Sequence, residues 1–359
     1  MMNLTFYLLT LLIVTSCNTL SKESKSIDKK IEEVVADNNI PSLSIGVIKN
    51  GKIALIKGYG HLSREESIKV DENSIFQIAS QSKMFTGIIV NNLILEGTLN
   101  IDKPITAYLP NEIIEDSKKT LSKITLKNIL NHSAGIPSDA CSIYSKRIEG
   151  EAWLKGYSKD DLIADLKKLS LEFEPNSKFQ YSNSGYVIVG FICENVSGLS
   201  YKELLRKYVA DTYDLKNTAV SLSSEQKSIL VTPYKKDNRE IATKASNMGM
   251  ATPASAIYSN AIDLTKILLE QINAYRKEET QNPLILTHQT SEMGQGLHYG
   301  FGLIKETKGN DIKYGHGGDA DGFACEYFLN PKKNTGVVIL TSSGGSWVGQ
   351  LANNILENL

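Results

Sequence analysis

The sequence predicts an α+β fold in which both chain ends build one antiparallel sheet flanked by helices, while the middle forms a helical lobe. Short apolar runs typical of strands occur near residues 43–56 and again after residue 299. Between them, apolar residues recur with helical spacing behind helix-start signals. We therefore expect an α/β lobe from residues 31–75 and 299–359 and a helical lobe from residues 76–298. A cleft between two lobes is a usual place for a functional site.

The N-terminal half of the sheet is expected to begin with a hairpin. An amphipathic helix is predicted near residues 26–37, and two apolar runs follow at residues 43–48 and 53–56. The dipeptide Asn50-Gly51 between them is a strong hairpin signal, because both turn positions require positive φ.

Helix starts and turn residues divide the rest of the chain. Ser158 with Asp161, and Ser200 with Glu203, have the spacing of capping boxes at helix N-termini. Turn-forming residues separate apolar runs in the C-terminal part, and a last helix with one apolar stripe follows. The expected C-terminal strands are residues 299–306, 311–315, 324–329 and 336–341.

Composition excludes several classes of function. With 359 residues, 41% of them hydrophobic, the chain can bury a large core. A formal charge of −1, without a basic cluster interleaved with aromatics, gives no reason to expect a nucleic-acid partner. We find no His-Glu-x-x-His motif, Walker loop or dinucleotide fingerprint, so no metal and no organic cofactor are expected. The oligomeric state stays open.

Three cysteines lie within the expected domain. Cys141, Cys193 and Cys325 are odd in number and lack metal-site spacing. Because Cys193 and Cys325 stand in apolar runs, we expect buried thiols rather than a disulfide framework.

Residues 1–16 are predicted to be a lipoprotein-type signal peptide. Their apolar core is too short to span a bilayer comfortably and is followed by small residues. Val14-Thr15-Ser16-Cys17 resembles the lipobox of bacterial lipoproteins, in which the cysteine is lipidated and becomes the new N-terminus. Because no Lys or Arg precedes the apolar run, an ordinary secretory signal and an N-terminal anchor helix are the alternatives. With lipidation at Cys17, residues 17–30 form a polar tether. The protein then faces the periplasm in the bacterial envelope. The outer membrane is favoured over the inner one as the place of the anchor, and the inner membrane stays the alternative.

The strongest functional signal is Ser80 followed three residues later by Lys83, where a short apolar approach turns into an apolar helix. Residues three apart share a helix face, so the lysine amine is expected beside the serine hydroxyl. A desolvated lysine can take the serine proton, and free N–H groups at a helix start favour the negative charge formed on attack of a carbonyl. Ser26 and Ser224 also precede a lysine by three residues, but both lie in polar stretches that favour a solvated helix.

Two further segments carry groups that could serve the same chemistry. Tyr181 and Asn183 stand two apart in an expected loop, where a tyrosine can shuttle a proton and an asparagine can bind a substrate amide. His316 stands in a glycine-rich strand end, where a ligand can approach closely and a histidine can donate a hydrogen bond. Each signal is weak alone. A glycine-rich turn with an exposed histidine would also explain the His316 segment, and its His-x-Gly pattern recurs at His298 and Gly300.

In order and spacing, the three segments resemble the penicillin-recognising serine hydrolases. The likeness is greatest to the class C β-lactamase-like branch, with its DD-peptidases, D-aminopeptidases and family VIII esterases. That family carries a Ser-x-x-Lys helix, then a Tyr-x-Asn loop, then a Lys/His-x-Gly strand. Residues 124–137 and 315–323 resemble it as well, so the likeness covers residues 31–359. It implies the serine β-lactamase/DD-peptidase-like fold, and we expect His132 to hold a loop rather than touch substrate.

The resemblance also implies a role for each residue. Ser80 would be the acylated nucleophile and Lys83 its proton acceptor. Tyr181 would protonate the leaving group and activate the hydrolytic water, while Asn183 binds the substrate amide. His316 would occupy the strand position next to Tyr181.

The strand triplet departs from the usual Lys-Thr-Gly of class C β-lactamases. It runs from His316 to Gly318, and the backbone N–H groups of Ser80 and Asp319 would form the oxyanion hole. A histidine near its reference pKa of ~6.5 is mostly neutral at pH 7, and Asp319 and Asp321 add negative charge. We therefore expect a serine hydrolase acting on ester or D-residue peptide or amide substrates, either small molecules or peptides. The alternatives are a β-lactamase, a penicillin-binding DD-carboxypeptidase, a non-catalytic sensor lipoprotein and a purely structural envelope lipoprotein.

Overall fold

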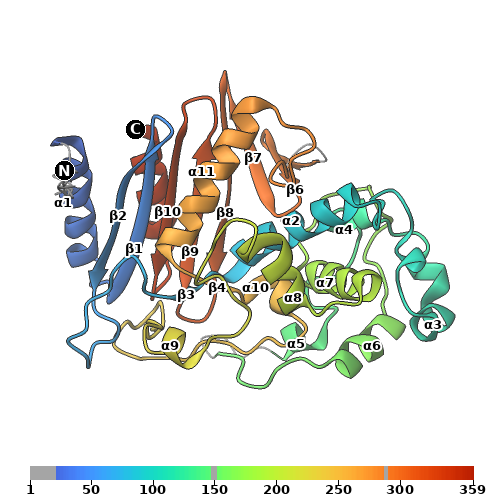
Figure 1. Ribbon diagram of the computed structural model, residues 1–359. Coiled ribbons are helices and arrows are strands. Elements are labelled where there is room, and N and C mark those ends of the chain that lie inside the picture. Colours follow the sequence, from blue (N-terminus) through green and yellow to red (C-terminus); the bar gives the residue numbers. More distant parts are fainter. Residues whose placement is uncertain (1–21, 147–151, 287–289) are drawn as a thin grey trace, which may run out of the picture.

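The computed structural model describes residues 22–146, 152–286 and 290–359, and these form the α+β fold that the sequence predicts (Figure 1). The strands are β1 (Ser42–Lys49), β2 (Lys52–Gly60), β3 (Phe76–Gln77), β4 (Tyr258–Ser259), β5 (Ser291–Gly294), β6 (Leu297–Gly300), β7 (Leu303–Lys308), β8 (Asp311–Asp319), β9 (Ala324–Asn330) and β10 (Thr335–Thr341). The helices are α1 (Lys22–Asp37), α2 (Ser82–Leu95), α3 (Asn111–Leu121), α4 (Leu126–Leu130), α5 (Ser142–Ser145), α6 (Lys159–Lys167), α7 (Asn183–Ser197), α8 (Tyr201–Leu205), α9 (Ser224–Lys227), α10 (Thr252–Ser255), α11 (Ala261–Lys277) and α12 (Ser346–Glu357). Shorter turns are η1 (Ala79–Gln81), η2 (Ile105–Ala107) and the π-helical η3 (Arg206–Ala210).

The main sheet joins the two ends of the chain. Its order is β2-β1-β10-β9-β8-β7-β6-β5, so β1 pairs with β2 on one side and with the last strand on the other. The expected hairpin between β1 and β2 is confirmed: Asn50 and Gly51 have φ of 52° and 69°. A separate two-stranded pair, β3 with β4, brings residues far apart in sequence together just before the first helix of the second lobe.

Helices cover both faces of the sheet (Figure 1). On one face, alternate residues of β1 such as Ile45 and Val47 pack with apolar residues of α12, including Leu351. On the other face α11 lies so close to β1 that a Cβ at Gly46 would lie 1.7 Å from Oγ1 of Thr265. Burying each large aliphatic side chain in these layers contributes about 1.5–3 kcal/mol.

The expected boundary between the lobes therefore needs correction. Helix α11 and strands β5 and β6 fall at least partly within residues 76–298, the span predicted to form the helical lobe, yet they belong to the sheet layer. The reason is that α11 has a helical pattern like its neighbours in sequence, and periodicity does not report what its apolar face packs against.

Helix α1 also corrects the expected tether at residues 17–30. Residues 22–30 form the first part of α1, and Ile31, in the same helix, is fully buried against the sheet. The amine of Lys57 on β2 lies 2.7 Å from the Asp28 carboxylate on α1, which helps to dock the helix. The predicted signal peptide and Cys17 lie outside the described residues.

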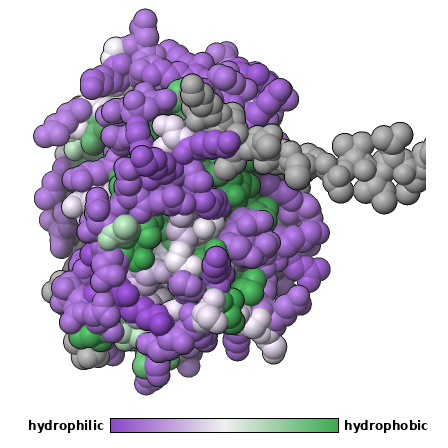
Figure 2. Space-filling view, turned by 90° about the vertical axis from the view of Figure 1, so that its left-hand side faces the viewer, coloured by the Kyte–Doolittle hydropathy of each residue, from purple (hydrophilic) through white to green (hydrophobic). Residues whose placement is uncertain are grey.

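The outer surface around α1 and the edge strand β2 is mostly hydrophilic, with apolar atoms gathered near its middle (Figure 2). Among the described residues, no helix is both long and apolar enough to cross a membrane.

The C-terminal strands differ from the expected pattern at one place that matters for the site. Residues 299–306 were predicted as a single strand, but β6 and β7 are separate because Phe301 and Gly302 form a turn with φ of 55° and 91°. This turn presses on α2, since a Cβ at Gly302 would lie 2.3 Å from the backbone oxygen of Lys83. The sheet thereby touches the helix that carries the candidate site.

The next strand is longer than expected. Strand β8 continues beyond residue 315 to Asp319, so it includes His316 and Gly318 and pairs them with β9. Glycines end the apolar alternation at residue 315, and the sequence pattern therefore stops before the strand does.

Local helix signals in the second lobe are confirmed. Ser158 accepts a hydrogen bond from the Asp161 backbone N–H at 3.1 Å, and Ser200 accepts one from Glu203 at 3.4 Å. Both are complete capping boxes, at the starts of α6 and α8. The expected thiols Cys193 and Cys325 are also buried and free.

Candidate active site

Ser80 lies in the turn η1, directly before α2, on a backbone that its neighbours hold in place. The preceding residue, Ala79, is fully buried and has φ of 46°, a conformation that costs a non-glycine residue about 1–3 kcal/mol. Strand β8 packs against this point so closely that a Cβ at Gly318 would lie 2.4 Å from the oxygen of Ile78. The Cys325 thiol on β9 donates to the same oxygen at 3.1 Å. The sheet thus fixes the position of Ser80.

Lys83 is in the first turn of α2, and its amine lies 3.1 Å from Oγ of Ser80. The amine also donates to Oδ1 of Asn183 at 2.8 Å and to the carbonyl of Ala254 at 2.7 Å. The side chain is fully buried, and burial lowers the pKa of Lys83 well below its usual value. All three neighbouring groups are uncharged, so none of them offsets this effect.

The partners of Lys83 also determine the direction of its lone pair. The amide oxygen of Asn183 and the carbonyl of Ala254 can only accept hydrogen bonds. A neutral amine has two N–H groups, and these two acceptors occupy both. The lone pair is then left for the Ser80 hydroxyl, which is the arrangement that a general base for this serine requires.

Tyr181 packs over the same amine. The Lys83 nitrogen lies 4.8 Å from the centre of the Tyr181 ring, and that ring lies 6.1 Å from the ring of His316. The Tyr181 hydroxyl is buried, and no group among the described residues meets it in full hydrogen-bond geometry. Burial raises the pKa of Tyr181, and the nearby Ser80 hydroxyl only partly opposes this shift. The phenol therefore keeps its proton at neutral pH and can act as an acid.

His316 faces the site as a neutral ring. Burial, reinforced by the charge of Lys83, lowers the pKa of His316 to about 3. Its Nδ1 is hydrogen-bonded to the carbonyl of Gly317, and since a carbonyl only accepts, Nδ1 carries the proton. The other nitrogen, Nε2, is buried without a partner in the described part of the chain, and in this tautomer it is an acceptor. We expected His316 to donate a hydrogen bond to substrate, whereas this tautomer accepts one instead.

His132 occupies the position expected of a loop-holding residue. Its Nδ1 accepts a hydrogen bond from the backbone N–H of Ser182, between Tyr181 and Asn183, at 3.1 Å. Its ring centre also lies 4.3 Å from that of Tyr181, so it supports this ring directly.

Asp319 ends β8 beside Ser80's turn. Its side chain is exposed, and a Cβ at Gly344 would lie 3.2 Å from Oδ2 of Asp319. The oxyanion role of the backbone N–H groups of Ser80 and Asp319 stays a prediction.

Sequence reasoning missed several groups here. The Ala254 carbonyl is a direct partner of Lys83, yet a backbone oxygen leaves no trace in residue type. Among the described residues, the hydroxyls of Tyr144 and Ser255 are buried without a partner in hydrogen-bond geometry, and burial raises the pKa of Tyr144. Within the described ranges, His, Cys, Asp and Glu side chains do not gather in groups of three or more that could hold a metal ion.

The chain is similar to known proteins along most of its length. The family model described as Beta-lactamase matches residues 27–357. Protein flp of Staphylococcus aureus (strain N315) is 26% identical over 332 residues, which is 92% of this chain and 65% of flp. The teichoic acid D-alanine hydrolase of Staphylococcus aureus is 26% identical over 287 residues, 79% of this chain and 66% of the relative. The chain thus spans about two thirds of the length of these relatives.

A solved structure shows the same fold. The octameric penicillin-binding protein homologue from Pyrococcus abyssi superimposes with a TM-score of 0.77 at 24% sequence identity. The match covers 93% of this chain and 76% of that one. The expected serine β-lactamase/DD-peptidase-like architecture is therefore confirmed.

Proposed function

The chain belongs to the beta-lactamase family, generally one of serine hydrolases, and on this premise we propose that it forms an acyl-enzyme at Ser80 on ester or D-residue amide substrates. One observation carries the proposal. The Lys83 amine is buried among uncharged partners and lies 3.1 Å from the Ser80 hydroxyl. That environment favours the neutral amine, which is the form able to accept the serine proton.

The proposed reaction has two halves. Lys83 takes the proton of Ser80 as Oγ bonds to the substrate carbonyl carbon, giving a tetrahedral intermediate. Tyr181 gives its proton to the leaving oxygen or nitrogen as that bond breaks, and the Lys83 ammonium returns a proton to Tyr181. A water molecule then attacks the carbonyl carbon of the acyl-enzyme and loses its proton to the Tyr181–Lys83 pair. The bond to Ser80 breaks, and the same pair returns a proton to the Ser80 oxygen.

The polar groups near Ser80 favour a substrate of a particular charge. A neutral His316 that accepts a hydrogen bond offers nothing to a substrate carboxylate, and the exposed Asp319 repels one. Both groups suit a substrate with N–H donors or an ammonium group. D-alanyl esters, which carry a free ammonium, fit this description, and one relative is a teichoic acid D-alanine hydrolase. We therefore favour D-alanyl esters over β-lactams.

The nucleophile is tested by labelling with a fluorophosphonate and intact mass measurement. Wild type and Ser224→Ala should gain one label, and Ser80→Ala should gain none. Ser224 is the matched control because it also precedes a lysine by three residues, in the exposed helix α9. Labelling of Ser80→Ala at the wild-type rate would refute the assignment.

The substrate class is tested with two esters and a drug. A D-alanyl ester should have kcat/KM about tenfold above its N-acetylated form, and Asp319→Asn should reduce that preference. Benzylpenicillin should be a poorer substrate than either ester. A kcat/KM for penicillin that rivals the ester values would point to a β-lactamase, and a persistent penicillin adduct would point to a DD-peptidase.

Cell location is part of the proposal. We propose that Cys17 is lipidated and holds the enzyme on the periplasmic side of the bacterial envelope. The Cys17→Ala variant should then leave the membrane fraction and lose the lipid mass. Retention of both would contradict it.

A further inference from the structure

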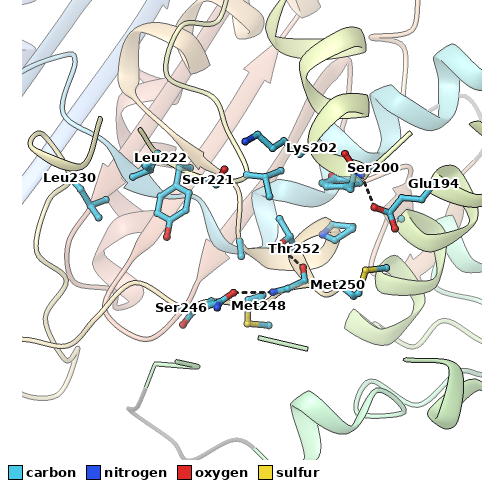
Figure 3. Close-up of a pocket in the computed structure, with 18 of the residues that line it drawn as sticks. Glu194, Ser200, Lys202, Ser221, Leu222, Leu230, Ser246, Met248, Met250 and Thr252 are labelled. Carbon is cyan, nitrogen blue, oxygen red and sulfur yellow. Dashed lines mark hydrogen bonds between the residues drawn. The ribbon is translucent and has the colours of Figure 1, made fainter. Parts of the chain in front are cut away.

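A cavity is bordered by α10, the helix whose Ala254 carbonyl contacts Lys83 (Figure 3). Its volume is about 600 Å³, within the range of small-molecule sites. Helices α7, α8 and α10 and residues 246–250 form its walls, and among the described residues that line it are neither Ser80 nor Lys83 nor Tyr181.

The lining of this cavity is mainly apolar. Met248 and Met250 lie on one side of it and Leu222 and Leu230 at one end (Figure 3). Flexible methionine side chains adapt to ligands of irregular shape and are common at such surfaces. This part of the cavity suits a hydrocarbon chain.

The cavity lining has more positively than negatively charged side chains. Lys202 and Lys227 contribute two exposed side chains to the lining, and Figure 3 shows Lys202 extending along the cavity above the apolar residues. Glu194 is the one carboxylate among the described lining residues. It accepts a hydrogen bond from the backbone N–H of Tyr201 at 2.6 Å, and burial raises its pKa. The cavity therefore offers a net positive edge to an apolar interior.

We propose that this cavity binds a single-chain amphipathic anion, a fatty carboxylate, and that binding modulates acyl transfer. The chain lies against the methionines and leucines, and the carboxylate meets Lys202 and Lys227. This site is separate from the proposed catalytic function and its binding step does not depend on that function.

The link to catalysis runs through α10. Pro253 lines the cavity, and its carbonyl accepts a hydrogen bond from Oγ1 of Thr86 on α2 at 2.7 Å. The next carbonyl, that of Ala254, accepts from the amine of Lys83 at 2.7 Å. A ligand that shifts this four-residue helix changes the hydrogen bond between the Ala254 carbonyl and the Lys83 amine. Because that amine is the proposed base, kcat changes rather than KM.

The binding test is calorimetric titration of the full chain with decanoate, using decylamine as the probe of opposite charge. Decanoate should bind and decylamine should not. The double variant Lys202→Gln/Lys227→Gln should weaken decanoate binding about tenfold, whereas Lys236→Gln, an exposed lysine outside the lining, should leave it unchanged. Met250→Trp should abolish binding by filling the cavity. Absence of decanoate binding, or binding that the double variant leaves unchanged, would overturn the proposal.

The second test measures ester hydrolysis with and without decanoate. In wild type kcat should change at least about twofold, and in the double variant at the same decanoate concentration it should change less. Decanoate that binds without altering kcat, or that competes with the ester, would overturn the regulatory step. The double variant changes two exposed side chains only, so its fold can be checked independently by circular dichroism.

Discussion

Two lysines in this molecule have opposite surroundings and opposite pKa shifts. The amine of Lys83 in the site is fully buried and contacts three uncharged groups, and burial lowers its pKa. The amine of Lys57 on β2 is partly exposed and lies 2.7 Å from Asp28 and 3.3 Å from Glu32. Burial acts to lower the pKa of Lys57 as well, but the two carboxylates outweigh it, and the pKa is raised.

The difference lies in the counter-charge. A lysine that meets a carboxylate stays an ammonium and can dock one element on another, as Lys57 docks α1 on the sheet. A lysine buried without a carboxylate gives up its proton more readily and becomes a base. The same residue type therefore serves structure at one place and proposed chemistry at the other.

The largest expected effect comes from removing each amine in turn and comparing kcat/KM of the two variants. Lys83→Met should lower kcat/KM for a small ester by about 10³–10⁴-fold, since the general base is lost. Lys83→Arg should be no better, because a guanidinium stays protonated. The matched control Lys57→Met should stay within about twofold of wild type. A Lys83→Met variant with wild-type kcat/KM would remove this lysine from the mechanism.

A second variant gives Lys83 the kind of neighbour that Lys57 has. Asn183→Asp places a carboxylate where the amide oxygen now lies 2.8 Å from the amine. An adjacent opposite charge moves a pKa by about 1–3 units, here upward, so the ammonium form would persist at pH 7. Activity at pH 7 should fall about 10²-fold and recover in part as the pH rises.

The pH profile of kcat/KM decides this prediction. Its acidic limb should move to higher pH in Asn183→Asp. A lower activity with an unshifted limb would show that Asn183 serves substrate binding alone. Asn92→Asp is a control on the same helix as Lys83 and should leave the limb where it is, because Asn92 bonds only to the backbone of Ile88 in the contacts described.

The sequence was sufficient to predict the site groups that are side chains of a recognisable residue type. The pair Ser80 and Lys83 lies about 100 residues before Asn183 and its neighbour Tyr181, yet we expect all four in one site. The structure brings them together around one amine. Their assignment rested on a resemblance between motifs, since each signal alone had a plain structural alternative.

What the sequence could not predict depends on packing and backbone. The Ala254 carbonyl, the left-handed Ala79 and the tautomer of His316 all follow from tertiary contacts. The close packing of α11 on β1, which leaves no room for a Cβ at Gly46, is likewise tertiary. None of these features has a signature in residue type or period.

Two buried histidines, His316 and His132, should make the fold sensitive to acid. An unfolded histidine gains a proton below pH ~6.5, whereas His316 in the fold stays neutral until about pH 3. The unfolded state then binds more protons, so the free energy of unfolding falls as the pH drops through this interval, by about 1.4 kcal/mol per pH unit for each such histidine. His132, whose pKa burial also lowers, acts in the same direction.

Urea unfolding at several pH values measures this effect. Between pH 6.5 and 5, His316→Asn should lose about 2 kcal/mol less of its unfolding free energy than wild type does. His61→Asn, which replaces an exposed histidine, controls for the loss of an imidazole elsewhere on the protein. Equal slopes in wild type and His316→Asn would show that the ring is protonated in the folded state as readily as in the unfolded one.

The smallest expected effect belongs to the ion pair of the other lysine. Asp28→Asn removes the carboxylate that contacts Lys57 at 2.7 Å and accepts from the Tyr59 hydroxyl at 2.7 Å. Because the Lys57 side chain is 36% exposed, solvent screens the pair, and the loss of stability should be only about 0.5–1 kcal/mol in urea unfolding. Although burial opposes it, the pKa of Asp28 is lowered by Lys57, so this contribution should be present at neutral pH and disappear as acid protonates the carboxylate. Asp116→Asn, in a more exposed pair with Lys167, should reduce the stability even less.

The same variant, Asp28→Asn, should leave kcat unchanged. Helix α1 contacts the sheet at β2, which is at the opposite edge of the sheet from β5. An effect of Asp28→Asn on kcat would contradict the separation of the docking lysine from the catalytic lysine.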